Sequence, residues 1–409
     1  MEQVLYQLRD GWCYRELASL CKFENGDRGK NYPSRDAFVE AGIPVINAGN
    51  LDGRKIVEAG LNYITRERYD ILGSGKVRQG DLLFCLRGSL GKCAIVSNLK
   101  EGAIASSLVI VRASESLDPN YLLYYFNSSL CSTFIERYNN GAAQPNLSAK
   151  SLSKFLIPLA SLKEQKRIVE KLDALLTRID TAIMYLQECL TLKSSLLQSA
   201  LDGQFLAITD RMMIESVADV KGGKRLPKGE KLSDSTTEHP YIRVADFTDK
   251  GTIGLSGIKY ISKEIHEQIK RYVISKDDLY ISIAGTIGKT GFVPPELDGA
   301  NLTENAAKLV IKDKQQLDLS YLYLYTLTSD FSAQAGLATK TVAQPKLALT
   351  RLSKIEIPMC SLGEQKALVE TVEALKSKIH DAEKVLLGKI EDLKCLKASI
   401  LDSAFKGEL

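Results

Sequence analysis

Residues that build metal sites are scarce in this sequence. Only three histidines occur among the 409 residues, at His239, His266 and His380, and they are widely separated from one another and from the eight cysteines. No two cysteines form a C-x-x-C pair. We therefore predict no metal site, and we expect the cysteines to be reduced and mostly buried.

Long apolar runs and a large charge excess are also lacking. No stretch is apolar enough for a membrane span, and the first residues have no signal-peptide core. This predicts a cytoplasmic protein without a membrane partner. The formal net charge is only +4, from 54 basic and 50 acidic residues. Such a small excess does not by itself indicate a nucleic-acid partner, so any basic surface has to be local.

Catalytic motifs are missing as well. Residues 285–290 resemble the end of a phosphate-binding loop, but that motif needs a glycine where the chain has Ile283. We find no nucleophile elbow, no glycine-rich cofactor loop after a first strand, and no Asn/Asp-Pro-Pro-Tyr/Phe element of an amino-methyltransferase. The chain is therefore expected to be a binding protein that is not an enzyme and carries no cofactor.

One long helical stretch is present twice. Residues 157–166 read Ile-Pro-Leu-Ala-Ser-Leu-Lys-Glu-Gln-Lys, and residues 357–366 read Ile-Pro-Met-Cys-Ser-Leu-Gly-Glu-Gln-Lys. In both, Ser-x-x-Glu follows a proline and precedes a periodic run, which is typical of a capping box at the start of a helix. Each helix is predicted to have about 40 residues and a length of roughly 60 Å.

Both runs carry a narrow apolar seam with steps of three and four residues, which indicates a coiled coil. The predicted seam residues are Val169, Leu172, Leu176, Ile179, Ile183, Leu186, Leu190 and Leu197 in the first run, and Leu368, Val372, Leu375, Ile379, Ala382, Leu386, Leu393, Leu396 and Ile400 in the second. Lys193 and Lys389 break the two seams. The closing segments match at an offset of 204, which places Gly203 and Gly407 just past the helix ends and predicts four extra residues in the second helix.

The segments before each helix read as two related globular domains. Residues 1–156 and 206–356 share an order of short strands, a glycine-containing turn and a helix, and residues 157–205 and 357–409 are the helical segments. In the first domain, strands are predicted at 43–47, 80–86 and 108–111, and the helix at 119–138. Mixed strands and helices without regular βα alternation predict an α+β fold. The chain is therefore interpreted as a tandem repeat. If the helices pair as an antiparallel coiled coil, the domains are related by a pseudo-two-fold axis, a symmetry that a DNA duplex shares.

Two surfaces recur in both domains and are candidates for DNA contact. The first is an early polar loop with Arg28, Lys30, Asn31 and Tyr32 in the first domain, and Lys221, Lys224, Arg225 and Lys228 in the second. Arg, Lys and Asn can contact phosphates and base edges. A solvated loop remains the alternative.

The second candidate surface is a Gly-x-x-Gly-Lys turn, with Arg87, Ser89 and Lys92 in the first domain and Thr286 and Lys289 in the second. Its open amides suit an anion, but the glycines equally suit a tight turn that needs positive φ. Four further residues are predicted to contact DNA: Asn47, Arg243, Lys340 and Lys346.

The repeated helix entry, the Gly-Asp-Leu or Asp-Asp-Leu strand running into Gly-x-x-Gly-Lys, and the Leu-Arg-Asp-Gly-Trp start at residues 8–12 together resemble the specificity (S) subunit of type I restriction-modification systems. The resemblance spans essentially the whole chain. It implies a non-catalytic prokaryotic subunit with two target recognition domains, each reading one half of a bipartite gapped DNA sequence. Because recognition domains diverge within this family, the base-reading residues are predicted from chemistry alone.

The resemblance also implies the partners. The helices are expected to space the domains and dock two methyltransferase (M) subunits, which flip an adenine and methylate its N6. Restriction and motor (R) subunits join them, and S-adenosylmethionine, ATP and Mg are expected on these partner subunits. A coiled-coil adaptor whose two domains bind proteins remains the alternative, because the net charge is small.

Overall fold

The computed structural model contains two compact units, each with one globular domain. The residues that it describes are 5–27, 29, 32–33, 35–139, 146–337 and 346–409. The first unit comprises Met1–Gln187 and Leu387–Leu409, and the second comprises Glu188–Leu386. Two long helices, α6 (Leu162–Leu206) and α12 (Leu362–Lys406), each begin in one unit and end in the other. The predicted α+β class is confirmed.

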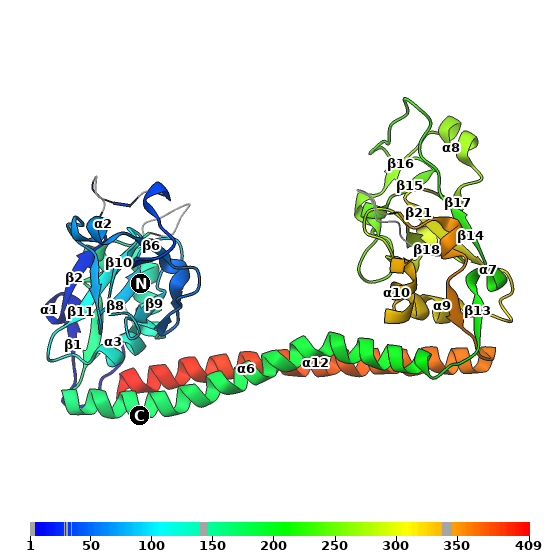
Figure 1. Ribbon diagram of the computed structural model, residues 1–409. Coiled ribbons are helices and arrows are strands. Elements are labelled where there is room, and N and C mark those ends of the chain that lie inside the picture. Colours follow the sequence, from blue (N-terminus) through cyan, green and yellow to red (C-terminus); the bar gives the residue numbers. More distant parts are fainter. Residues whose placement is uncertain (1–4, 28, 30–31, 34, 140–145, 338–345) are drawn as a thin grey trace. The chain divides into compact units, whose positions relative to one another are not determined.

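The first domain contains two four-stranded sheets (Figure 1). One has the order β2 (Cys21–Asn25), β11 (Leu108–Ala113), β8 (Leu82–Cys85) and β9 (Cys93–Ile95), and the other β6 (Asn62–Ile64), β3 (Ile43–Ile46), β10 (Glu101–Ile104) and β7 (Lys76–Arg78). Only β3 and β10 pair in parallel among these strands. Smaller pairs are β1 (Cys13–Glu16) with β12 (Leu156–Leu159), and β4 (Leu51–Asp52) with β5 (Lys55–Ile56). The helices are α1 (Leu17–Leu20), α2 (Arg66–Asp70), α3 (Pro119–Phe126), α4 (Ser129–Tyr138) and α5 (Ala149–Leu152).

The second domain repeats both four-stranded sheets, whereas the β4–β5 pair is replaced there by an isolated bridge between Phe247 and Ile253. Its sheets have the orders β14 (Ala218–Gly222), β21 (Ala306–Ile311), β18 (Leu279–Ser282), β19 (Thr290–Phe292), and β16 (Lys259–Tyr260), β15 (Pro240–Ile242), β20 (Ala300–Leu302), β17 (Val273–Ile274). Strand β13 (Arg211–Met213) pairs with β22 (Glu356–Pro358). The helices are α7 (Ile214–Val217), α8 (Lys263–Ile269), α9 (Leu319–Thr326), α10 (Ser329–Leu337) and α11 (Leu349–Leu352). The predicted tandem repeat is confirmed.

The helix expected over residues 119–138 is in fact two helices, α3 and α4. The Ser128 hydroxyl accepts a hydrogen bond from the amide of Cys131, so Ser128 caps a new helix and ends the old one. Thr328 caps the corresponding break in the second domain by accepting from the amide of Phe331. A hydroxyl residue that caps the second helix therefore marks the boundary in both copies.

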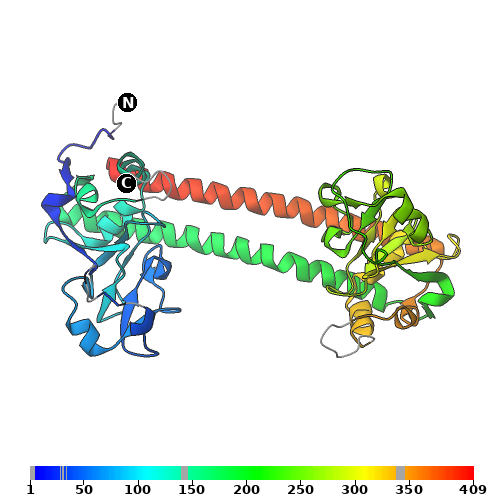
Figure 2. The same ribbon diagram turned by 90° about the horizontal axis from the view of Figure 1, so that it is seen from above.

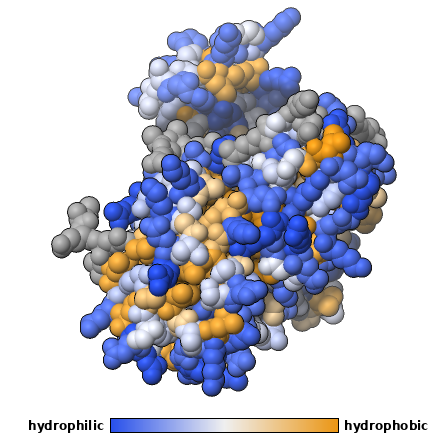
Figure 3. All heavy atoms as spheres, turned by 90° about the vertical axis from the view of Figure 1, so that its left-hand side faces the viewer, coloured by the Kyte–Doolittle hydropathy of each residue, from blue (hydrophilic) through white to orange (hydrophobic). Residues whose placement is uncertain are grey.

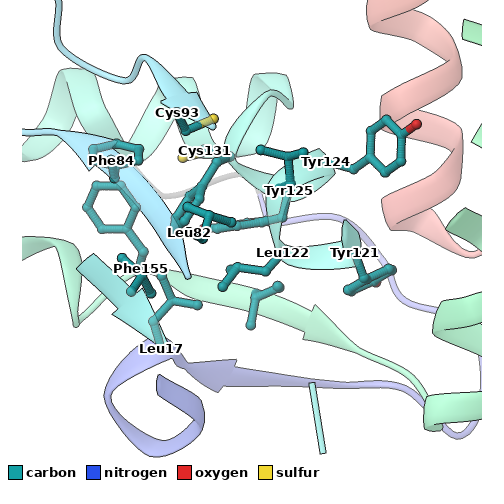
Figure 4. Close-up of a cluster of buried hydrophobic side chains, with 14 of the residues drawn as sticks. Leu17, Leu82, Phe84, Cys93, Tyr121, Leu122, Tyr124, Tyr125, Cys131 and Phe155 are labelled. Carbon is teal, nitrogen blue, oxygen red and sulfur yellow. The ribbon is translucent and has the colours of Figure 1, made fainter. Parts of the chain in front are cut away.

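Aromatic side chains of α3 fill the core of the first domain. All residues from Tyr121 to Phe126 are buried, and the rings of Phe84 and Phe126 lie 4.8 Å apart. Figure 4 shows Phe84 and Phe155 on one side of this cluster, while Tyr124 points away from it. The hydroxyl of Tyr124 donates to Asp173 of α6 over 2.6 Å. Helix α3 therefore joins the sheet to the long helix.

The cysteines differ in part from the expectation. Four are buried, but Cys13, Cys189 and Cys395 are exposed, and Cys360 is half-buried. The three exposed residues lie on a short strand and on the outward faces of the long helices, where apolar neighbours in the sequence do not imply burial.

The repeated aspartate before strands β8 and β18 is structural. Asp81 accepts from the amide of Arg78 and pairs with Arg112 at 2.8 Å, and Asp278 accepts from the amide of Ser275 and pairs with Lys308 at 2.8 Å. Both carboxylates are almost fully buried. A cation from the same sheet therefore neutralises each of them.

Replacing Asp278 by alanine is expected to lower the free energy of unfolding by about 2–4 kcal/mol, because it leaves the Lys308 ammonium largely buried without its partner. The neighbouring Asp277, whose side chain is 60% exposed, is the matched control, and its replacement should cost under about 0.5 kcal/mol. Urea denaturation of the two variants measures the difference. Equal effects would show that the buried pair does not stabilise the domain.

The two long helices have the same length, so the expectation of four extra residues in the second is wrong. Both contain 45 residues. Gly203 lies inside α6, and only Gly407, with φ of +82°, follows a helix end as predicted. The correct alignment keeps the offset of 200 throughout and matches Phe205 with Phe405.

The helices lie side by side within each unit, as Figures 1 and 2 show. In the first unit Lys397 of α12 pairs with Asp180 of α6 at 2.6 Å. Arg167, near the start of α6, donates to the carbonyl of Leu409, which lies beyond the end of α12. The two helices are therefore antiparallel. In the second unit Lys193, the predicted break, pairs with Glu383.

The second seam also differs from the prediction: Ile390 is buried, while Ala382 and Leu396 are exposed.

Each domain is clamped by the start of one long helix and the end of the other. The buried Gln165 amide accepts from the amide of Asp118 and donates to the carbonyls of Ser116 and Ala160, and Gln365 repeats all three bonds in the second unit. At the helix ends, Phe405 contacts the rings of Tyr121 and Tyr125, and Phe205 contacts those of Tyr321 and Tyr325.

Candidate nucleic-acid interface

The early loop of the second domain is fastened to the end of strand β20. Gly223 passes so close to this strand that a Cβ would lie 2.1 Å from the carbonyl oxygen of Thr303, so only glycine fits. The amide of Lys224 donates to the Leu302 carbonyl over 2.8 Å, and the Tyr241 hydroxyl donates to the Lys224 carbonyl over 2.7 Å. The residues that follow therefore leave the sheet from a fixed point.

Arg225 is the first side chain beyond this anchor. Its side chain is 79% exposed, and its Nε donates to Oε1 of Glu304 over 2.6 Å. Partial burial alone would raise the pKa of Glu304, but hydrogen bonds from Arg225, from its own amide and from Thr303 outweigh it, and the pKa is lowered. Glu304 is therefore an anion that pairs with an exposed guanidinium.

An open groove of about 590 Å³ follows the loop. Its cations are Arg225, Lys228 and Arg243, and its carboxylates are Glu230 and Glu304. Tyr241, Thr303 and Asn305 add polar lining groups. The structure thus brings together three of the predicted DNA-binding residues, although the groove is mixed in charge.

Arg243 and Asn47 occupy equivalent positions, each directly after the strand that pairs in parallel in its domain. Both precede a 3₁₀ turn, Val244–Asp246 or Ala48–Asn50, whose last side chain accepts from their backbone amides. The Arg243 guanidinium also donates to Asp246 and to the Gly257 carbonyl. Most of its donors are therefore used within the domain.

The Gly-x-x-Gly-Lys turns are tight turns with positive φ at both glycines: +76° and +85° at Gly88 and Gly91, and +76° and +89° at Gly285 and Gly288. The amides of Gly91 and Gly288 donate to carbonyls of the preceding strands, over 3.1 and 2.9 Å. The need for positive φ is thus confirmed, and these amides are not free for an anion. Exposed side chains remain at Arg87, Ser89, Lys92 and Thr286.

The turns lie next to the segments that close the domains. Arg87 forms a β-bridge with Asn146, and Ala284 forms one with Lys346. Lys346 is exposed and therefore extends the surface around Thr286. Lys340 lies outside the described residues.

The early loop of the first domain is anchored in the same way. A Cβ at Gly26 would lie 2.9 Å from the Ile104 carbonyl oxygen, and the Asp27 carboxylate accepts from the amides of Gly29 and Gly73. Tyr32 is half-buried, whereas Arg28, Lys30 and Asn31 lie outside the described residues. Figure 3 shows hydrophilic side chains interspersed with apolar ones on one side of this unit.

Some of the cations predicted to bind DNA form ion pairs within the domain, and others do not. Lys221 pairs with Asp219 at 3.0 Å, and Lys289 pairs with Asp249 at 2.7 Å. Within the described part of the chain, Arg87, Lys92, Lys228 and Lys346 make no ion pair, so their charges are available to phosphates. Lys224 lies over the ring of Tyr272 at 5.6 Å.

Sequence reasoning missed Glu304 and Tyr241. Glu304 is 79 residues from Arg225, and the two segments meet through the pairing of β14 with β21 and the bond from the Lys224 amide to the Leu302 carbonyl. In the first domain the equivalent position is Ser106, two residues beyond the strand. No local pattern distinguishes such a carboxylate from a solvated one.

The described residues contain neither a membrane-spanning helix nor a cluster of metal ligands. No helix in the described ranges is long and apolar enough to cross a membrane. Among those residues, no group of three or more His, Cys, Asp or Glu side chains is placed to hold a metal ion.

Residues 9–184 and 210–391 match the family described as type I restriction modification DNA specificity domain. The type I restriction enzyme EcoBI specificity subunit of Escherichia coli is 29% identical over 290 residues, an alignment that covers 64% of this chain but only 60% of that subunit. One similar solved structure comes from work on the structural basis of complex assembly and conformational transition in the type I R-M system. It has a TM-score of 0.72 at 22% identity, and the alignment covers 99% of this chain and 100% of that chain. The HsdS subunit from Thermoanaerobacter tengcongensis has a TM-score of 0.62 at 21% identity, with 100% of both chains covered.

Proposed function

The chain belongs to the family of type I restriction-modification DNA specificity subunits, and from this premise we propose that its two target recognition domains each read one half of a bipartite, gapped sequence in double-stranded DNA. As a specificity subunit it is non-catalytic. The early loops, the groove of the second domain and the exposed turn cations would contact the duplex.

One observation supports this proposal best: the same scaffold carries different side chains in the two domains. Gly26 and Gly223 anchor equivalent loops against equivalent strands. At matching positions the first domain has Asn47 and the second has Arg243, and both stand directly before the same 3₁₀ turn. A constant frame with variable chemistry is what reading two different half-sites requires, because base identity is read by individual side chains.

The helices α6 and α12 would space the half-sites and dock two methyltransferase subunits, with restriction subunits joining the assembly. S-adenosylmethionine, ATP and Mg would then be bound by those partners. We place the assembly in the cytoplasm of a prokaryote, where its DNA substrate lies.

A genome-wide map of N6-methyladenine tests the proposal. Cells with this chain and its methyltransferase subunit are compared with cells that lack only this chain. We expect a gapped two-part motif that disappears with the chain. The matched control is a strain with an inactive methyltransferase, which should lose the same motif.

Identical maps would contradict the proposal. Binding of the purified assembly to DNA at rising salt then identifies the remaining explanation. Steep salt dependence would indicate DNA binding without methylation, and its absence would favour the adaptor function.

A further inference from the structure

Among the cations of the groove in the second domain, Arg225 has the geometry of a base reader. A guanidinium has five N–H donors in a rigid fork, and Arg225 uses Nε for Glu304, which leaves its two terminal amino groups for another acceptor. Such a pair of donors matches O6 and N7 of guanine in the major groove. Arg243 instead spends Nε and Nη2 on Asp246 and Gly257.

Glu304 is well placed to hold Arg225 in this orientation. Its side chain is only 24% exposed, against 79% for that of Arg225, so the carboxylate is the fixed member of the pair. Glu304 lies two residues past Leu302, the last residue of strand β20. The hydroxyl of the adjacent Thr303 donates to Oε2 of Glu304 over 3.0 Å. The anchored backbone of Lys224 fixes the other side.

We propose that Arg225 reads a guanine in the half-site of the second domain and that Glu304 is its positioning residue. This inference rests on the proposed function and deepens it by naming one base and the pair that reads it. The equivalent position in the first domain is Ser106, so the first domain lacks this carboxylate and must read its half-site with other side chains.

The test uses the chain assembled with its methyltransferase subunits and a duplex library in which the second half-site is randomised. Selection by binding, followed by sequencing, gives the base preference at every position. For Arg225→Ala we expect the preference for guanine at one position to fall between about fivefold and a hundredfold, the range of a bidentate contact. Preferences at other positions and in the first half-site stay unchanged.

Variants at Glu304 separate positioning from a mere charge effect. Glu304→Ala should lose the same guanine preference, add little to Arg225→Ala in the double variant, and raise affinity for random DNA, because a negative charge is removed. Glu304→Gln should retain most of the preference, since its amide oxygen can still accept from Nε. Lys314→Ala and Asp277→Asn, in an exposed ion pair of the same unit, are matched controls and should change nothing.

The outcomes discriminate among the explanations. If Arg225→Ala weakens binding to all sequences equally and lowers the salt slope by about one, Arg225 contacts a phosphate and the inference is overturned. A preference for another base, or full discrimination in Glu304→Ala, would overturn it too. If the wild-type assembly shows no gapped motif at all, the proposed function fails before Arg225 is tested.

Discussion

Replacing Phe405 by alanine is expected to lower the stability of the first unit by about 3–5 kcal/mol, the usual cost of removing a fully buried phenylalanine. The ring is 0% exposed and lies 5.1 and 5.9 Å from the rings of Tyr121 and Tyr125. Because Phe405 anchors the last turn of α12 on α3, the cavity should also loosen the end of that helix.

The single tryptophan of the sequence, Trp12, reports on this change. It lies beside the helix end, since a Cβ at Gly407 would be 3.5 Å from its Cε2 atom. We expect its fluorescence to change at lower urea concentration in Phe405→Ala than in the wild type. Leu396→Ala is the control on the same helix, because Leu396 is 49% exposed.

Phe205, which packs the end of α6 against the second domain, supplies a second control. Phe205→Ala should destabilise the second unit by a similar amount but leave the Trp12 transition near its wild-type position. The adjacent Leu206 is 79% exposed, so Leu206→Ala should have little effect on either unit. If Phe205→Ala and Phe405→Ala moved the Trp12 transition equally, the units would not unfold separately.

Local chemistry explains why so much of the fold could be predicted. The Ser-x-x-Glu boxes start both long helices where expected: Leu162 and Leu362 follow Ser161 and Ser361, whose hydroxyls accept from the amides of Glu164 and Glu364. The strands around Ile43, Leu82 and Leu108 were equally clear, because short apolar runs bounded by glycine or polar residues favour buried strands.

The predictions that were wrong or incomplete share a physical cause: each depends on which residues are in contact in the folded chain, and a local sequence pattern does not contain that information. Matching Gly203 to Gly407 was locally reasonable, but burial of Phe205 and Phe405 fixes the true correspondence. Likewise the seam was predicted to be broken at Lys389, whereas its neighbour Ile390 is buried and continues it. The pairing of Arg225 with Glu304 depends on sheet topology and could not be predicted from either segment alone.

Replacing Gln165 by leucine is expected to cost about 2–5 kcal/mol in the first unit. Leucine is similar in size, so little cavity forms, but the Asp118 amide and the carbonyls of Ser116 and Ala160 lose their partner. Leaving a buried polar group unsatisfied costs about 1–3 kcal/mol each, and water can reach only the more exposed of these groups. Denaturation followed by Trp12 fluorescence measures the loss.

The adjacent Lys166 is the matched control, since its side chain is exposed and Lys166→Leu removes no internal bond. Gln165→Glu is a sharper variant, because it keeps an acceptor for the Asp118 amide but loses both donors and buries a carboxyl group. It should be destabilised at least as much as Gln165→Leu at neutral pH and recover partly in acid, where the carboxyl is protonated and can donate once. A stable Gln165→Leu variant would mean that packing, and not this amide, joins helix α6 to the first domain.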